Sequence, residues 1–172
     1  MKKVIIFILF IFVSFQSNIL AGTPYFIDFK YILNESEAGK KAQKTLKTRL
    51  ENNLKKLSEK QKKIQEEEKK IIQQKKIISP EEYKKKVSEL RNKVSNLQKE
   101  RNKILSDISE QRVKARNELL KNLNPIIKDY MLEKKIRMVI DKKNLLLADE
   151  TLDLTKDIMA LLNKKLKSIN LN

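Results

Sequence analysis

The sequence contains no cysteine and no histidine, and only two of its 172 residues are glycine. Thiol nucleophiles, imidazole catalysis, disulfides and metal sites built from these residues are therefore excluded. The two glycines, Gly22 and Gly39, cannot form a glycine-rich loop that binds phosphate. The sequence therefore argues against an enzyme, and it predicts no catalytic residue, no cofactor and no metal ligand.

Proline is almost as scarce, and only Pro80 interrupts the long stretch from residue 38 to residue 124. Proline is favoured at the first position of a helix, and serine is a preferred N-cap, so Ser79 and Pro80 together predict a helix start. Glu81 and Glu82 follow in the first turn, where the helix dipole favours acidic side chains. The stretch therefore predicts two long helices folded back on each other, with a tip at residues 78–82.

The second of these helices carries a heptad pattern of apolar residues, which is typical of coiled coils. The pattern is interrupted only at Arg101, where we expect the aliphatic stem to lie along the seam while the charge reaches water. In the first helix one heptad position is apolar throughout, but its companion position is mostly polar. The apolar positions are Tyr83, Val87, Leu90, Val94, Leu97, Ile104 and Ile108 in the second helix, and Leu50, Leu57, Ile64, Ile71 and Ile78 in the first.

The formal net charge of the chain is +17, from 39 basic and 22 acidic residues. Residues 38–78 alone contain 14 basic and 5 acidic residues, so the positive field is strongest on the first helix. Such a charge indicates an anionic partner, which could be nucleic acid, acidic lipid or acidic polypeptide. The charge alone does not choose among them.

The first residues have the pattern of a secretory signal peptide. Two lysines precede an apolar run from Val4 to Phe15, and a small residue, Ala21, follows at the expected cleavage point. The run is shorter than the roughly 20 residues that a membrane span needs. We therefore predict a cleaved signal peptide over residues 1–21; an uncleaved membrane anchor is the alternative.

The segment from Thr23 to Leu33 alternates in the manner of a half-buried strand. After it, Asn34 and Glu37 resemble a capping box that would start the first long helix. Asn124 and Pro125 predict a kink or restart of the second long helix, and Thr155 predicts the cap of a last helix. Between them, residues 136–141 and 145–148 predict the two strands of a hairpin, with a turn at residues 142–144.

These strands come from both ends of the chain and predict one small body from which the helices project. The fold class is therefore mainly α with a small β body, with the arm at residues 38–124 and the body at residues 22–37 and 125–172. Three short strands form a small core and leave exposed edges, so we expect subunits to share the body in an oligomer. The residues predicted for this oligomerisation body are Tyr25, Ile27, Phe29, Tyr31, Met138, Ile140 and Leu146.

Three stretches, residues 25–46, 78–86 and 126–162, together resemble the OmpH/Skp family of periplasmic chaperones. The most specific parts are residues 32–36, at the end of the first predicted strand, and residues 139–141 followed by 152–155. The resemblance implies a jellyfish-shaped homotrimer in the periplasm, with a shared β-rich body and three helical-hairpin arms around a cavity. It also implies binding of unfolded outer-membrane proteins, without ATP, so that they do not aggregate.

Other interpretations of the sequence remain open. A structural coiled coil that binds an acidic lipid surface or the cell wall is the main alternative. A nucleic-acid-binding protein would suit the charge, but export removes the chain from nucleic acid, so no specific nucleic-acid partner is expected. Individual client-binding lysines of the arm cannot be assigned, and Tyr83 is predicted to be a packing residue. Asp141 and Asp153 are predicted to form local hydrogen bonds and caps instead of a catalytic pair.

Overall fold

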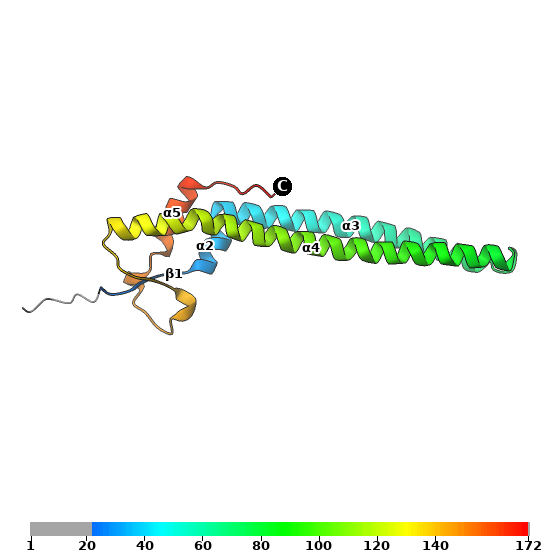
Figure 1. The fold of residues 1–172 in the computed structure, drawn as a ribbon, viewed down its shortest axis with the longest axis horizontal. Helices are drawn as coiled ribbons and strands as arrows, with labels where there is room; N and C mark the ends of the chain where they lie inside the picture. Colours follow the sequence, from blue (N-terminus) through cyan, green and yellow to red (C-terminus); the bar gives the residue numbers. More distant parts are fainter. Residues whose placement is uncertain (1–21, 172) are drawn as a thin grey trace, which may run out of the picture.

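The computed structural model describes residues 22–171, so the predicted signal peptide at residues 1–21 lies outside the described residues. A long helical hairpin projects from one end of a small body (Figure 1). The first helix of the hairpin is α3 (Glu37–Gln74) and the second is α4 (Pro80–Glu133). This architecture confirms the predicted fold class, mainly α with a small β body and a long helical arm.

The tip of the hairpin has the predicted cap. Ser79 is the N-cap of α4, where its hydroxyl accepts a hydrogen bond from the backbone N–H of Glu82 at 3.2 Å. Pro80 is the first helical residue, where its missing N–H leaves no hydrogen bond unmade. The predicted start of the second helix at Ser79 and Pro80 is therefore confirmed, while the first helix ends at Gln74.

The two helices pack along the predicted seam. Leu57 and Ile71 of α3 are buried, as is Ile108 of α4, while Arg101 is exposed. Val94, which the pattern places in the seam, is 50% exposed. The outer arm thus buries a narrow apolar stripe, and a helix pair with so few buried contacts opens more readily than a packed core.

Of the kink or restart expected at Pro125, the restart is wrong, because α4 continues through this residue to Glu133. Proline within a helix removes one backbone hydrogen bond and is normally destabilising. Leu123 and Ile126, on either side of Pro125, are buried in the body at 0% and 7% exposure. Their burial holds this part of the chain in the helix, so tertiary packing outweighs the local preference of proline.

The strand expected over residues 23–33 is much shorter, and most of it is a helix. Only β1 (Tyr25–Ile27) is extended, and α2 (Phe29–Glu35) follows. The carboxylate of Asp28 accepts the N–H of Tyr31 at 2.7 Å and caps α2. This local hydrogen bond favours a helix start over further pairing, and the helix buries Ile32 completely.

The start of α3 also differs from the predicted capping box. Asn34 lies within α2, and the N-cap of α3 is Ser36, whose buried hydroxyl accepts the N–H of Gly39 at 3.2 Å. A Cβ atom on Gly39 would lie 2.1 Å from the carbonyl oxygen of Leu33. Glycine is therefore required where α2 turns sharply into α3.

The predicted hairpin at residues 136–148 is wrong. The strand β2 (Val139–Asp141) pairs in parallel with β1, with Tyr25 opposite Val139 and Ile27 opposite Asp141. A short 3-10 turn, η1 (Lys142–Asn144), follows β2, and residues 145–148 form no strand. The Asp141 carboxylate accepts the N–H of Lys143 at 3.2 Å, and this cap turns the chain away from the sheet.

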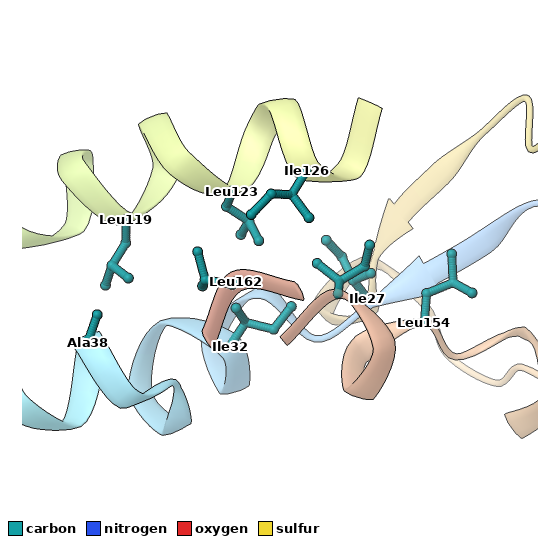
Figure 2. Close-up of a cluster of buried hydrophobic side chains, with 9 residues drawn as sticks. Ile27, Ile32, Ala38, Leu119, Leu123, Ile126, Leu154 and Leu162 are labelled. Atoms are coloured by element: carbon teal, nitrogen blue, oxygen red, sulfur yellow. The ribbon is translucent and has the colours of Figure 1, made fainter. Parts of the chain in front are cut away.

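The body closes around a core made by segments from both ends of the chain (Figure 2). A second 3-10 turn, η2 (Glu150–Leu152), leads into the last helix, α5 (Thr155–Lys165). The N-cap of α5 is Leu154 and not the predicted Thr155, which is its first residue. The buried core residues are Ile27, Ile32, Ala38, Leu119, Leu123, Ile126, Leu154, Ile158 and Leu162.

Residues 166–171, here called the strap, run from the end of α5 back along the base of the arm (Figure 1). Leu171 is buried at 6% exposure against Ala42 and Leu46 of α3 and Ile108 and Ala115 of α4. Burial of these apolar side chains gives the arm a second, smaller core near its base.

Candidate functional site

The sheet of the body leaves one strand edge without a partner in residues 22–171. β1 pairs with β2 on one side, and Phe26 forms an isolated bridge to Asp153 on the other. The outer edge of β2 has no strand beside it in this part of the chain. Unpaired edges offer backbone N–H and C=O groups to strands of other chains, so this edge is a candidate association surface.

Exposed apolar residues flank β2 in the sequence. Leu146 and Leu147 are 103% and 92% exposed, and Met138, just before β2, is 54% exposed. Leu145–Ala148 also line a hollow of about 490 Å³ next to Phe26. Neighbouring apolar side chains that are fully open to water usually mark a protein or membrane contact.

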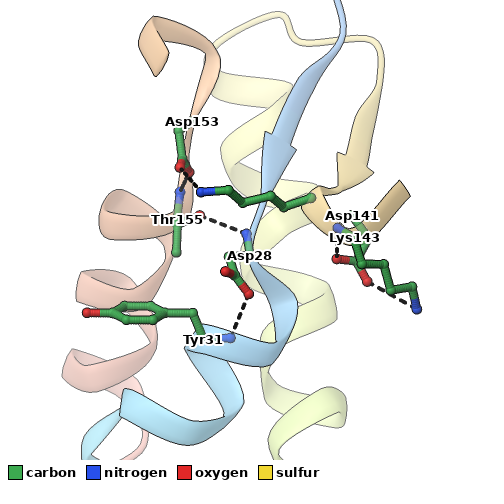
Figure 3. A network of polar contacts seen from close by, with 7 residues as sticks. Asp28, Tyr31, Asp141, Lys143, Asp153 and Thr155 are labelled. Atoms are coloured by element: carbon green, nitrogen blue, oxygen red, sulfur yellow. Dashed lines mark hydrogen bonds and ion pairs between the residues drawn. The ribbon is translucent and has the colours of Figure 1, made fainter. Parts of the chain in front are cut away.

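Polar contacts tie the sheet to the start of α2 and of α5 (Figure 3). Asp153 accepts the N–H of Thr155 at 2.8 Å, and its carboxylate lies 3.8 Å from the ammonium group of Lys142. The Thr155 hydroxyl in turn accepts the N–H of Asp28 at 2.8 Å. The local hydrogen bonds predicted for Asp141 and Asp153 are present, Asp141 as the cap of η1 and Asp153 as the acceptor from Thr155, although the predicted hairpin around them is not formed.

The residues predicted for the oligomerisation body divide into two groups. Ile27 lies in the core of the same subunit, and Tyr25 and Phe29 pack against that core. Ile140 is half-buried on β2, and three of the predicted residues are exposed: Tyr31, Met138 and Leu146. Because Tyr31 belongs to a helix instead of a strand, it does not line up with the residues of β1.

Two exposed apolar surfaces lie outside the predicted site residues. Leu147 is as exposed as Leu146, and the three consecutive leucines at 145–147 could have revealed it. A second hollow, of about 350 Å³, lies on the end of α4 and is lined by Ile127, Met131, Leu132 and Ile136. Leu132 is 71% exposed. The spacing of Ile127 and Met131, one helical turn apart on α4, is the sequence signal for this surface.

The arm offers a different kind of surface, which is basic and almost entirely exposed. Two ion pairs link α3 to α4, Lys60 with Glu100 and Lys93 with Glu67, each at 2.6 Å. These pairs are partly exposed and are therefore worth little to stability. Since basic residues outnumber acidic ones on both helices, most arm cations face solvent and can act on an anionic partner.

Tyr83, near the tip, is half-buried, and the ammonium group of Lys75 lies 5.8 Å from the centre of its ring. This cation–π contact joins the last turn of α3 to the first turns of α4. Ile72 and Ile77, close by, are 60% and 83% exposed. The tip therefore combines positive charge with apolar side chains that are open to water.

Three ionisable groups have a shifted pKa, and in each case a hydrogen bond is the main cause. The Tyr130 hydroxyl donates to Asp157 at 2.8 Å, which raises the pKa of Tyr130. A hydrogen bond to Glu35 raises the pKa of Lys40, and the backbone N–H of Thr151 lowers the pKa of Asp149. All three contacts join neighbouring elements or lie within a turn, so they are structural contacts.

Residues 22–171 contain no group of three or more carboxylates placed to hold a metal ion. Within the same residues, each helix is too short or too polar to cross a membrane. The candidate functional surfaces are therefore the open edge of the body and the basic arm.

The described residues thus combine a long basic hairpin with a small body that has an open strand edge. The chain belongs to the family of OmpH-like outer membrane proteins, whose sequence pattern it matches over residues 25–162. Among curated proteins, no sequence match is found.

The fold is similar to the crystal structure of a Caulobacter crescentus CB15 protein named as an outer membrane chaperone (OmpH-like). The TM-score is 0.79, at 20% sequence identity, over 91% of this chain and 94% of the other. At this identity the similarity establishes the fold, and the family match is consistent with it.

Proposed function

We propose that this protein is a periplasmic holdase chaperone, which binds unfolded outer-membrane proteins and prevents their aggregation without ATP. The observation that carries the proposal is the long basic arm in a member of the OmpH-like family. The name of the similar Caulobacter protein, an outer membrane chaperone, supports the same role. No catalytic residue is assigned, and the predicted signal peptide supports export.

The proposed binding uses many weak contacts. Exposed cations attract clients with acidic stretches through a field that salt screens beyond about 10 Å at 0.1 M. Apolar residues near the tip, such as Ile77, add short-range contacts with unfolded chain. Because each contact is weak, a client that folds can leave without a chemical step, while several contacts together hold an unfolded client.

We also propose that the active form is a homotrimer, as the family resemblance implies. The open edge of β2 and the exposed Leu146 and Leu147 support association through the body. Strands from neighbouring subunits would pair with the open edge, and apolar contacts would cover the leucines. Three arms would then extend from one side of a shared body and enclose a client.

The test is the mass of the exported chain in solution, measured by light scattering with and without a urea-unfolded membrane barrel. We expect a trimer that keeps the barrel soluble as a discrete complex. Replacing two exposed arm cations, Lys69→Gln and Lys70→Gln, should raise the chaperone concentration that is needed to keep the barrel soluble. The matched control, Lys164→Gln and Lys165→Gln at the end of α5, should behave as the wild type.

A scaffold that binds an acidic lipid surface or the cell wall is the alternative, and the basic arm favours it as well. A protein that binds anionic vesicles but lets every barrel precipitate would support the scaffold. The holdase proposal would then be wrong, whatever the oligomeric state.

A further inference from the structure

The strap occupies an apolar groove at the base of the arm. The groove, here called the arm-root groove, is formed by Ala42, Leu46 and Leu50 of α3 and by Ile108 and Ala115 of α4. The strap fills it with two side chains, Ile169 and Leu171. Ala42 and Ala115 are the small residues that leave space between the helices for these side chains.

The strap shows what kind of chain the groove accepts. It has no helical structure after α5, and its first residue, Leu166, has extended backbone angles (φ −131°, ψ 107°). In an extended chain, residues two apart point to the same side, which explains how Ile169 and Leu171 both reach the groove. The groove therefore accepts an extended segment with apolar side chains at alternate positions.

One polar contact fixes the backbone of the strap in the groove. The guanidinium of Arg49 donates to the carbonyl oxygen of Leu171 at 3.0 Å and to the side-chain oxygen of Gln111 at 3.0 Å. A carbonyl is present in every peptide, so Arg49 can hold any chain in this place. The groove thus recognises a backbone and an apolar pattern and not a particular sequence.

The strap buries little of its own surface, because only Leu171 of residues 166–171 is buried and Leu166 and Ile169 are half-buried. An exposed ion pair between Lys167 and Glu37, at 3.0 Å, is among its polar contacts. Exposed ion pairs contribute little, and segments with few buried contacts detach at low free energy. A hollow of about 380 Å³ remains beside the strap, with Lys41 and Lys44 in its wall.

We propose that the arm-root groove is a docking site for an extended client segment, and that the strap occupies it until a client displaces the strap. This inference rests on the proposed holdase function and names where a client first binds. Chains that form membrane β-barrels carry apolar residues at alternate positions, which is the pattern that Ile169 and Leu171 present. The strap also lies outside residues 25–162, so the family match does not account for it.

The strap would therefore act as an internal competitor. Apparent affinity falls with the fraction of molecules in which a site is open, so a filled groove weakens client binding. When the strap is displaced, the groove that it uncovers is apolar and has lysines beside it. Such a groove suits an unfolded segment with acidic neighbours. A protein without client would keep these apolar side chains covered and would not aggregate through them.

The first test uses Leu171→Lys, which places a charge in the apolar groove beside Arg49. The matched control is Ser168→Lys, which adds the same charge at an exposed position of the strap. Hydrogen exchange at residues 42–50 and 108–115 should quicken in Leu171→Lys alone. The same variant should need about threefold less chaperone to keep a client soluble, because its groove is open.

The second test needs no client. A labelled synthetic peptide with the sequence of residues 165–171 should bind Leu171→Lys at least about tenfold more tightly than the wild type. A control peptide in which the isoleucine and leucine are adjacent should bind neither protein. If hydrogen exchange shows that Leu171→Lys frees the strap, but this variant binds the peptide no more tightly than the wild type does, the docking proposal is wrong. This conclusion stands even where the protein still holds clients.

The remaining outcomes are also distinct. If wild type and both variants all fail to hold any barrel, the proposed holdase function fails, and the docking proposal fails with it. If light scattering shows that Leu171→Lys changes the oligomeric mass and Ser168→Lys does not, the groove exchanges straps between subunits. In that case a second copy, and not a client, is its occupant.

Discussion

The backbone N–H of Asp28 donates a hydrogen bond to the hydroxyl of Thr155 at 2.8 Å, across 127 positions of the sequence. Asp28 caps α2, and Thr155 is the first residue of α5. The whole arm lies between these two residues in the chain. This single contact therefore joins the two halves of the body where the arm begins and where it returns.

Replacing Thr155 by valine should destabilise the body. Valine keeps the shape of threonine but leaves the partly buried N–H of Asp28 without a partner, which costs about 1–3 kcal/mol. The free energy of unfolding, measured in urea at fixed protein concentration, should fall by this amount. Thr48→Val, at an exposed position of α3, is the control and should change it by less than about 0.5 kcal/mol.

Replacing Gly39 by alanine should destabilise the protein although alanine is the better helix former. The added Cβ would meet the carbonyl oxygen of Leu33 at 2.1 Å and the hydroxyl of Ser36 at 2.9 Å. Moving a backbone segment in a packed core typically costs about 1–3 kcal/mol or more. Gly22→Ala is the matched control, because its Cβ would meet only the Arg137 side chain, at 3.5 Å or more. Equal stability of the two variants would contradict this account of Gly39.

The arm is the part of the fold that the sequence predicts best. The sequence signals that predict the arm come from residues close together in the chain. Ser79 and Pro80 define a helix start, and the apolar residues at every seventh position define the seam. Each helix of the hairpin is held by hydrogen bonds between residues that are close in the sequence, and the same geometry repeats along its length. Periodicity and capping are therefore sufficient to predict two long helices and the start of the second, but not the cap of α3 or the continuation of α4 through Pro125.

The body was predicted less well because its structure depends on contacts between distant residues. The alternation at residues 25–31 suits a strand, but the Asp28 cap and the burial of Ile32 favour a helix. The partner of β2 is β1, more than 100 residues earlier, and no local pattern indicates that pairing. For the same reason the sequence predicts a strand at residues 145–148, where the structure has exposed Leu146 and Leu147 and no strand.

The contact between Tyr130 and Asp157 should make stability depend on alkaline pH. The neutral Tyr130 hydroxyl donates the hydrogen bond, so the pKa is raised above its ordinary value in the folded protein. The stabilisation is therefore complete below the unfolded pKa of about 10 and is lost as the pH rises through the folded pKa. The difference in unfolding free energy between wild type and Tyr130→Phe should shrink as the pH is raised above about 10. A difference that stays constant would show that the hydrogen bond to Asp157 does not stabilise the neutral Tyr130 hydroxyl.

Pro125 provides a test of how tertiary packing overrides local preference. Its ring removes one backbone hydrogen bond from α4, which costs about 3 kcal/mol of stability in a helix interior. Its rigid ring also lowers the conformational entropy of the unfolded chain, which stabilises the folded protein by up to about 1 kcal/mol. Pro125→Ala should therefore raise the free energy of unfolding by about 2 kcal/mol. Lys128→Ala, one turn further along α4 and exposed, should leave it nearly unchanged. A loss of stability in Pro125→Ala would contradict this expectation. It would mean that the proline shapes α4 so that Leu123 and Ile126 reach the core.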